Sequence, residues 1–193
     1  MKKWIPICLL VLSAGYASAQ QPPVSNPWRF HSVNTVGLLA AEAGNAFELQ
    51  TVNGAQFKSW FLGAGIGLDY YRYRTIPLFL DLRKEFFSGP DKLFLYADAG
   101  VSFAWVSDNQ KSGYLDEKFS NGFYNDFGLG YKRAIAKHSA FILSLGYSYK
   151  KLTQTYTQYN FYTDWLPGFG PASQMQKYNY AMNRLSIKIG WEF

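Results

Sequence analysis

Two His-Ser pairs are the residues of this sequence best suited to nucleophilic chemistry. They are His31-Ser32 and His138-Ser139, and they contain both histidines of the chain. A histidine within hydrogen-bond reach of a serine can take the hydroxyl proton and activate the oxygen as a nucleophile. Both pairs fall in or beside extended segments, where adjacent side chains point to opposite faces. We therefore interpret them as turn or interfacial histidines and predict no catalytic residue there.

A second candidate for chemistry is a set of charges at alternate positions. Asp81, Arg83 and Glu85 share one face of an extended segment. Two carboxylates beside a guanidinium can form an acid-base set, but such a row is more typical of a buried ion network. Other segments carry charges of both signs on their polar faces. The predicted network consists of Asp81, Arg83, Glu85, Asp98, Asp126, Lys132, Arg184 and Lys188.

The sequence predicts no cofactor and no metal. Gly63, Gly65 and Gly67 recur with a period of two and do not open a helix, so they are strand packing or curvature positions and not a phosphate loop. No His, Cys or carboxylate spacing is typical of a metal site. The formal net charge is +6, yet no basic run stands out, so nucleic acid is not an expected partner.

The N-terminus carries an export signal. Lys2 and Lys3 precede a short apolar run, and Ala17-Ser18-Ala19 forms an A-x-A cleavage site. We expect residues 1–19 to be a signal peptide and residues 20–29, which are rich in proline, to be a periplasmic lead-in. The single cysteine, Cys8, leaves with the signal, so the mature chain folds without disulfides, and we expect its residues 30–193 to form the folded domain.

The rest of the chain alternates apolar and polar residues, a pattern typical of β-strands. We predict eight strands and no amphipathic helix. Asn53-Gly54 is a two-residue hairpin signal, whereas residues 107–120 and 154–177 form long connections. Short turns on one side and long loops on the other are expected of a transmembrane β-barrel. The predicted strands cover residues 30–41, 46–52, 57–71, 75–87, 92–106, 121–135, 139–153 and 178–193.

The direction of the apolar face separates a membrane barrel from a soluble one such as a lipocalin. Trp60 and Tyr70 bracket an apolar row and lie ten residues apart, which at a tilt of roughly 40° spans about 25 Å, the height of an outer-membrane apolar band. The opposite rows mix glycine, serine and charges of both signs, which suits a narrow lumen. We predict an all-β, eight-stranded antiparallel transmembrane β-barrel in the bacterial outer membrane.

The signal peptide, the eight strands and the terminal IKIGWEF resemble the small outer-membrane β-barrels of Gram-negative bacteria, such as OmpX and the membrane domain of OmpA, within the porin-like superfamily. The resemblance covers residues 28–193 and implies fold and location more than activity. In such families a C-terminal aromatic strand is recognised by the barrel-assembly machinery, and Trp191 and Phe193 match that signal. Lys188 stands where a glycine often occurs.

The long loops are the remaining candidates for function, because an eight-stranded barrel is filled by side chains such as Phe61, Phe94, Tyr96 and Tyr124. Residues 154–177 form a possible external binding loop, or alternatively extend the preceding strand above the membrane. We expect a non-enzymatic structural or surface-interaction protein that contacts outer-membrane lipid, lipopolysaccharide or an unknown external ligand. Alternatives are a lipid A-modifying enzyme and an accessory subunit of a secretion or assembly complex. The loop aromatics are Tyr156, Tyr159, Phe161, Tyr162, Trp165 and Phe169.

Overall fold

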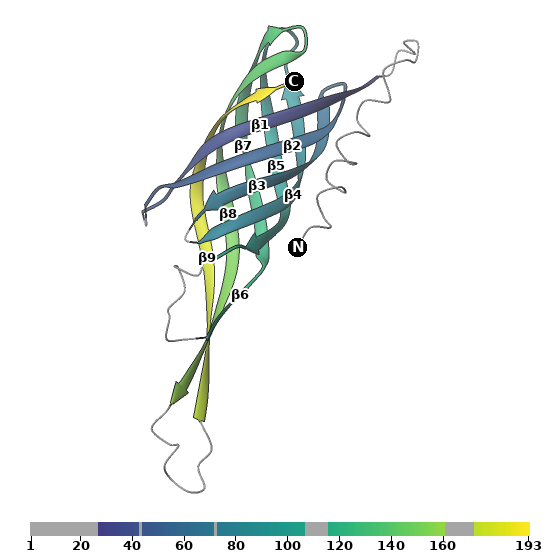
Figure 1. Ribbon diagram of the computed structural model, residues 1–193. Helices are drawn as coiled ribbons and strands as arrows, with labels where there is room; N and C mark the ends of the chain where they lie inside the picture. Colours follow the sequence, from purple (N-terminus) through teal and green to yellow (C-terminus); the bar gives the residue numbers. More distant parts are fainter. Residues whose placement is uncertain (1–26, 43, 72, 107–115, 161–171) are drawn as a thin grey trace, which may run out of the picture.

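The computed structural model describes residues 27–42, 44–71, 73–106, 116–160 and 172–193. The predicted signal peptide lies outside the described residues, as does the lead-in up to residue 26. Among the described residues, no helix is long and apolar enough to cross a bilayer. The described residues form one twisted sheet that curls into a barrel (Figure 1).

The strands follow the predicted alternation closely, although several begin or end a few residues from the predicted positions. Trp28 and Arg29, which we assigned to the lead-in, already belong to the first strand. The strands are β1 (Trp28–Ala40), β2 (Ala46–Phe57), β3 (Trp60–Tyr70), β4 (Arg74–Phe86), β5 (Asp91–Ala104), β6 (Asp116–Ser120), β7 (Gly122–Ala136), β8 (Ser139–Asn160) and β9 (Ala172–Glu192).

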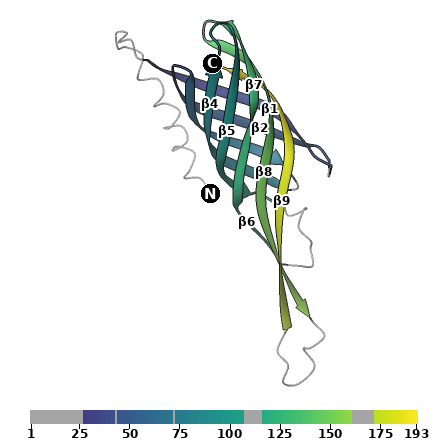
Figure 2. The same ribbon diagram turned by 180° about the vertical axis from the view of Figure 1, so that it is seen from behind.

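The sheet closes on itself through its first and last strands. All pairings are antiparallel, and β9 pairs with β8 on one edge and with β1 on the other. The closure extends to the last residue, because the Phe193 N–H donates to the Ser32 carbonyl at 3.0 Å and Ser32 N–H returns a bond to Phe193 at 2.7 Å. Figures 1 and 2 show this closed wall from its two sides. Closure removes the exposed sheet edges of the barrel.

β6 and β7 together occupy the sixth position in the wall. β6 pairs with β8 at Ser120↔Thr153, and β7 pairs with the same strand at Tyr124↔Lys150, so one extra residue interrupts the ladder. Gly122 lies at this interruption, where a Cβ would collide with the backbone of Lys151. Only glycine permits this close approach. The wall therefore contains eight strand positions, which confirms the predicted strand number.

The predicted hairpin at Asn53-Gly54 is wrong. Both residues lie inside β2, where Asn53 pairs with Ser32 on β1 and with Ala64 on β3. The chain turns instead at Lys58 and Ser59, and Lys58 adopts a positive φ of 55°. Gly54 faces Gly63 on β3, and a Cβ there would approach the Gly63 Cα at 2.5 Å. The glycine serves close strand packing, so the predicted second strand continues to Phe57.

The barrel interior is filled by aromatic rings that lie over glycines of neighbouring strands. Phe79 packs beside Tyr124, with ring centroids 5.4 Å apart, and both side chains are buried. A Cβ on Gly65 would lie 2.5 Å from the Phe79 ring, so the glycine makes room for that ring. The alternating glycines are therefore lumen packing positions, and the lumen contains a packed core. Its buried apolar members are Val33, Val52, Phe61, Phe79, Phe94, Tyr96, Tyr124 and Ile142.

Candidate functional site

The outer wall of the barrel is an apolar belt. Large apolar side chains on every barrel strand point outward, and many are about half exposed. Soluble monomers rarely expose contiguous apolar patches of more than a few hundred Å². Members of the belt are Val36, Leu38, Leu49, Leu62, Ile66, Leu78, Leu80, Leu82, Leu93, Leu95, Val101, Phe127, Leu129, Leu143, Leu145, Leu185, Ile187 and Ile189.

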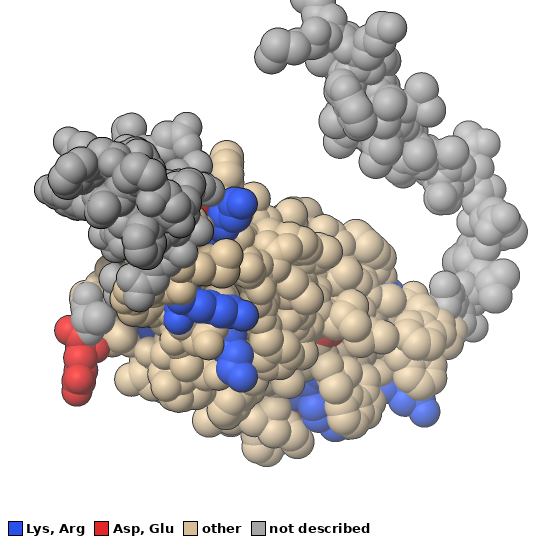
Figure 3. All heavy atoms as spheres, turned by 90° about the horizontal axis from the view of Figure 1, so that it is seen from below, with Lys and Arg blue, Asp and Glu red and all other residues tan. Residues whose placement is uncertain are grey.

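Aromatic residues bracket this belt at the ends of the strands. Trp60 and Tyr70, at the two ends of β3, are both exposed, and Trp105 and Trp191 are exposed at opposite ends of the wall. Lipid-facing apolar rows between aromatic girdles are the surface of a transmembrane β-barrel. In Figure 3, uncharged residues make up most of the visible surface, and Lys and Arg are confined to separate groups. The predicted fold class and the outer-membrane location are thus confirmed.

The middle of the lumen holds a row of three aspartates from neighbouring strands. Asp98 on β5 lies opposite Asp81 on β4 and opposite Asp126 on β7, and all three are almost fully buried. Lys188 Nζ reaches into the row from β9, 2.9 Å from Asp126 Oδ2 and 3.8 Å from Asp98 Oδ2. Arg83 Nε donates to both Asp81 oxygens at 2.9 Å. Two cations therefore serve three carboxylates.

The end of the lumen beneath the long loops is closed by a second group of polar contacts. Lys150 pairs with Asp69 and donates to Thr75 Oγ1 at 2.8 Å, and all three side chains are buried. Arg184 points inward as predicted but bonds to backbone oxygens, at 3.2 Å from Leu39 and 2.5 Å from Gly44. Within the described residues, its guanidinium therefore binds backbone carbonyls near the end of β1 and does not pair with a carboxylate.

The opposite end, which carries the start of β1, the C-terminus and the short turns, holds a third group. Lys132 Nζ lies 2.7 Å from Glu85 Oε1 and 2.5 Å from Glu192 Oε1. Lys92 bonds to the other Glu85 oxygen at 2.6 Å, and His31 Nδ1 lies 3.0 Å from Glu192. Lys92 and His31 were not part of the predicted network. The short turns make this end periplasmic.

Neither predicted His-Ser pair forms a nucleophile-base contact among the described residues. His31 turns toward Glu192, while the Ser32 backbone pairs with the C-terminus. His138 is exposed in the turn between β7 and β8, which lies at the periplasmic end. Across the described ranges, no group of three or more His, Cys, Asp or Glu side chains could hold a metal ion. The lumen charges form ion pairs that join strands.

At the other end, β8 and β9 continue together beyond the barrel. The last pair of β9 with β1 is Leu185↔Ala40, and the pairing of β8 with β7 ends at Lys150. Beyond these points residues 151–160 of β8 pair with residues 172–181 of β9, and β6 covers part of the other β8 edge. We call residues 151–160 and 172–181 the projecting hairpin. It is the narrow ribbon at the foot of Figure 1.

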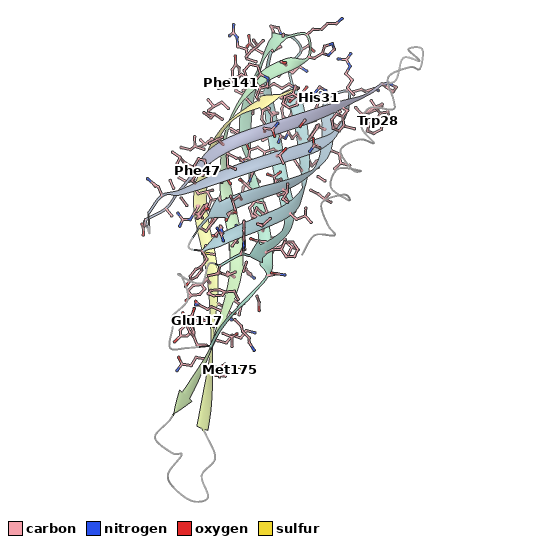
Figure 4. All side chains as sticks on the ribbon, viewed as in Figure 1. Trp28, His31, Phe47, Glu117, Phe141 and Met175 are labelled. Carbon is pink, nitrogen blue, oxygen red and sulfur yellow. The ribbon has the colours of Figure 1, made fainter. Side chains whose placement is uncertain are left out.

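Aromatic and amide side chains cover the described part of the projecting hairpin. Tyr156 and Tyr178 form an edge-to-face pair with centroids 5.4 Å apart, and Tyr180 donates to Gln154 at 3.1 Å. Tyr178 is 46% exposed and Met175 is 72% exposed. Figure 4 shows Glu117 and Met175 on this part of the molecule, at the end away from His31.

The structure divides the predicted external binding loop into two parts. Gln154 to Asn160 belong to β8, so the alternative that this segment extends the strand is confirmed for these residues. Tyr156 lies on the projecting hairpin beside Tyr178, and Tyr159 belongs to β8, where it pairs with Ser173. The other predicted aromatics, Phe161, Tyr162, Trp165 and Phe169, lie outside the described residues.

Comparisons with known proteins add little beyond the fold. No family model matches the sequence, and no curated protein matches it. Among solved structures, Neisserial surface protein A is 11% identical, with 86% of this chain and 96% of that chain covered and a TM-score of 0.49. OprG of Pseudomonas aeruginosa is 11% identical (84% and 94% covered, TM-score 0.48), and AlkL in lipid bilayers is 13% identical (91% and 95%, TM-score 0.45). The assignment as a transmembrane barrel rests on the strand pairing and apolar belt of this chain itself.

Proposed function

We propose that this protein is a non-enzymatic outer-membrane barrel that recognises an external partner through its projecting hairpin. The observation that carries this proposal is the length of the paired ribbon beyond the barrel. Ten residue pairs, from Lys151↔Ala181 to Asn160↔Ala172, lie past the closed wall. At about 3.3 Å per residue the ribbon extends roughly 33 Å. A bilayer span does not need this extra length.

The filled lumen supports a role at the surface over a role in transport through the barrel. Tyr124 and Lys150 are completely buried in the interior, and the three ion groups join strands that are not neighbours in the wall. Eight-stranded barrels have an interior just wide enough to be filled by side chains. The positions of the histidines also disfavour a His-dependent lipid A-modifying enzyme. Both histidines lie at the periplasmic end, on the side of the membrane opposite the outer leaflet.

The partner that best suits the hairpin is the saccharide part of lipopolysaccharide. Tyr178 presents a rigid ring with a polar tip, and its hydroxyl donates to the exposed amide side chain of Gln176 at 2.9 Å. Rigid aromatic rings give contact area at low entropy cost, and small polar groups add adaptable hydrogen bonds. A ribbon of this height stands where the sugars of the surrounding lipopolysaccharide lie.

Replacing residues 155–177 with Asn-Gly tests this function. The replacement leaves the Gln154↔Tyr178 pair beside a two-residue turn that suits a hairpin. We expect the shortened barrel to fold and to bind purified lipopolysaccharide at least about tenfold more weakly than the full chain. Lipid A without saccharide is the second probe, and the hairpin should not change its binding. The proposal fails if the shortened barrel binds lipopolysaccharide as tightly as the full chain.

We also propose that the terminal strand is read by the barrel-assembly machinery during biogenesis. Trp191 and Phe193 both point away from the lumen and are about half exposed, so their rings are available on the outer face of β9. Replacing Phe193 with Ser should slow assembly in cells, while the protein refolded from denaturant into detergent should reach the same barrel. Equal assembly rates in cells for both forms would contradict this role.

A further inference from the structure

The periplasmic mouth of the barrel contains a large cavity, and the third group of polar contacts described above lines it. Its volume is about 790 Å³, within the roughly 300–1,000 Å³ typical of small-molecule sites. The start of β1, the three short turns and the C-terminus all contribute to its wall, so the cavity is the open mouth itself. We call it the periplasmic basin. Figure 4 shows His31, one of its lining residues, beside the C-terminal end of the chain.

The rim of the periplasmic basin is positively charged. Arg29, Lys58 and Lys137 line it and are exposed, and within the described residues none of them takes part in an ion pair. The other two lining cations, Lys92 and Lys132, are already bound to Glu85 at 2.6 and 2.7 Å. The floor is therefore close to neutral, and the charge of the rim is uncompensated.

The floor of the periplasmic basin also contains a polar atom that lacks a partner. His31 Nδ1 is held by Glu192 at 3.0 Å, which fixes the orientation of the ring. Its Nε2 is buried and has no hydrogen-bond partner among the described residues. Buried polar nitrogens are normally satisfied by protein, water or ligand. Because Nδ1–H donates to Glu192, the free Nε2 can accept a hydrogen bond from a ligand hydroxyl beneath the ring of cations.

The cations are positioned by tight turns and not by flexible loops. Lys58 occupies the turn between β2 and β3 with a φ of 55°, and Gln56 Nε2 donates to its carbonyl at 3.0 Å. Lys137 lies in the two-residue turn between β7 and β8. Preorganised charges bind a ligand with less loss of conformational entropy. The first 26 residues contain no Asp or Glu, so that part of the chain supplies no counter-charge.

We propose that the periplasmic basin binds a phosphate group, offered either as the headgroup of an anionic lipid or as a soluble phosphate compound. A phosphate group combines negative charge with several acceptor oxygens. It can therefore contact Lys58, Lys137 and Arg29 at the rim while a hydroxyl of the ligand donates to His31 Nε2. The basin is larger than one phosphate, so the rest of the ligand fits within the mouth.

Two matched variants test this site on the purified full chain. Lys58→Gln with Lys137→Gln removes two charges from the rim, and Lys151→Gln with Lys177→Gln removes two exposed charges from the projecting hairpin. With pyrophosphate as the soluble probe, calorimetry should show about a tenfold loss of affinity for the rim pair. The hairpin pair should change the affinity by less than about twofold, because its charges lie at the far end of the barrel.

A second arm distinguishes the two sources of the phosphate. The protein is placed in nanodiscs of phosphatidylcholine with or without phosphatidylglycerol, and native mass spectrometry counts the phosphatidylglycerol retained on the barrel. Retention that depends on Lys58 and Lys137, without pyrophosphate binding, assigns the site to a lipid headgroup. Pyrophosphate binding assigns it to soluble phosphate compounds. The proposal is wrong if neither probe binds, or if the rim and hairpin pairs weaken binding equally.

The histidine provides a direct readout of occupancy. In a His138→Asn background His31 is the only histidine of the chain, so its ring nitrogens can be followed by NMR without overlap. The ligand identified above should shift the Nε2 resonance of His31, and the rim variant should abolish that shift at the same ligand concentration. An unshifted Nε2 at saturating ligand would exclude the predicted contact. Arg29→Gln is the replacement for the rim pair if the double variant does not fold.

Discussion

The barrel and the projecting hairpin are built from the same two strands but are stabilised differently. Within the barrel, β8 is paired on both edges, and its inward side chains, such as Lys150, are completely buried. Beyond the barrel β9 keeps only its β8 neighbour, and Met175 is largely exposed. One continuous alternating pattern therefore gives a rigid wall where the sheet closes and an accessible ribbon where it does not.

Because of this difference, we expect substitutions in the barrel to affect stability much more than substitutions in the hairpin. Inward residues of the barrel bear buried charges whose loss leaves a partner uncompensated, and outward residues face lipid. Apart from Leu152 and Gln154, which are buried, the described hairpin side chains are exposed or partly exposed. A substitution at an exposed position usually changes stability by about 0.5 kcal/mol or less. Matched substitutions in the two regions should consequently differ severalfold in their effect on unfolding.

The largest effect is expected at Lys188. Its Nζ lies 2.9 Å from Asp126 and 3.8 Å from Asp98, and the side chain is 3% exposed. Lys188→Met keeps most of the volume but leaves the aspartate row with Arg83 alone, which should cost about 3–5 kcal/mol of unfolding free energy. Urea unfolding in lipid vesicles measures this. Lys151→Met on the hairpin is the control, and equal losses would show that the two regions do not differ.

The second-largest expected effect tests which face of the barrel wall contacts lipid. Leu145 lies in the middle of the β8 wall and is 57% exposed on the lipid side. Leu145→Arg should destabilise the barrel by about 2–4 kcal/mol, because arginine at the bilayer midplane is costly. Met175→Arg makes the same kind of change on the hairpin in water and should be close to neutral. A neutral Leu145→Arg would mean that this face does not contact hydrocarbon.

Alternation was sufficient to predict the strands and their faces, because a period of two is decided locally. It failed where a local signal competed with tertiary pairing. Asn53-Gly54 is a strong turn signal, but its strand already had partners on both edges, so the turn moved to Lys58. Nothing in the type of Lys58 indicates a positive φ. The short strand β6 was missed for a related reason, since Asp116 to Ser120 is charged and too short to show a pattern.

The partners inside the lumen could not be predicted, because they belong to strands that are not neighbours. Lys188 on β9 reaches Asp126 on β7, and Lys132 on β7 reaches Glu85 on β4. Those contacts depend on the register of every intervening strand and on the barrel radius. The alternation of side chains along each strand did predict that these four residues face the lumen. The contact between His31 and Glu192 was missed, because alternation predicts the face on which a side chain lies but not the residue that it contacts.

A smaller effect is expected from the hairpin aromatics. Tyr178 packs edge-to-face on Tyr156 and is 46% exposed. Tyr178→Ala should remove about 0.5–1.5 kcal/mol of local stability. Hydrogen exchange should therefore become faster for residues 172–181, while the urea midpoint of the barrel stays unchanged. A shift of that midpoint would show that the hairpin and the barrel unfold as one unit, and that the proposed division between them is wrong.

The smallest effect is expected at Asp98, although this residue is as deeply buried as its neighbours. Its Oδ1 has no hydrogen-bond partner among the described residues, and its Oδ2 is 3.8 Å from Lys188. Asp98→Asn keeps the shape and removes one of three crowded charges, so the unfolding free energy should change by less than about 1 kcal/mol.

Asp126→Asn is the matched control. Asp126 accepts from Lys188 at 2.9 Å and from Tyr96 and Ser186 at 3.1 Å, so its loss should cost about 1–3 kcal/mol. If Asp98→Asn proves the more damaging of the two in urea unfolding, the negative charge of Asp98 is itself needed by Lys188. The aspartate row would then need all three of its negative charges to balance the neighbouring cations.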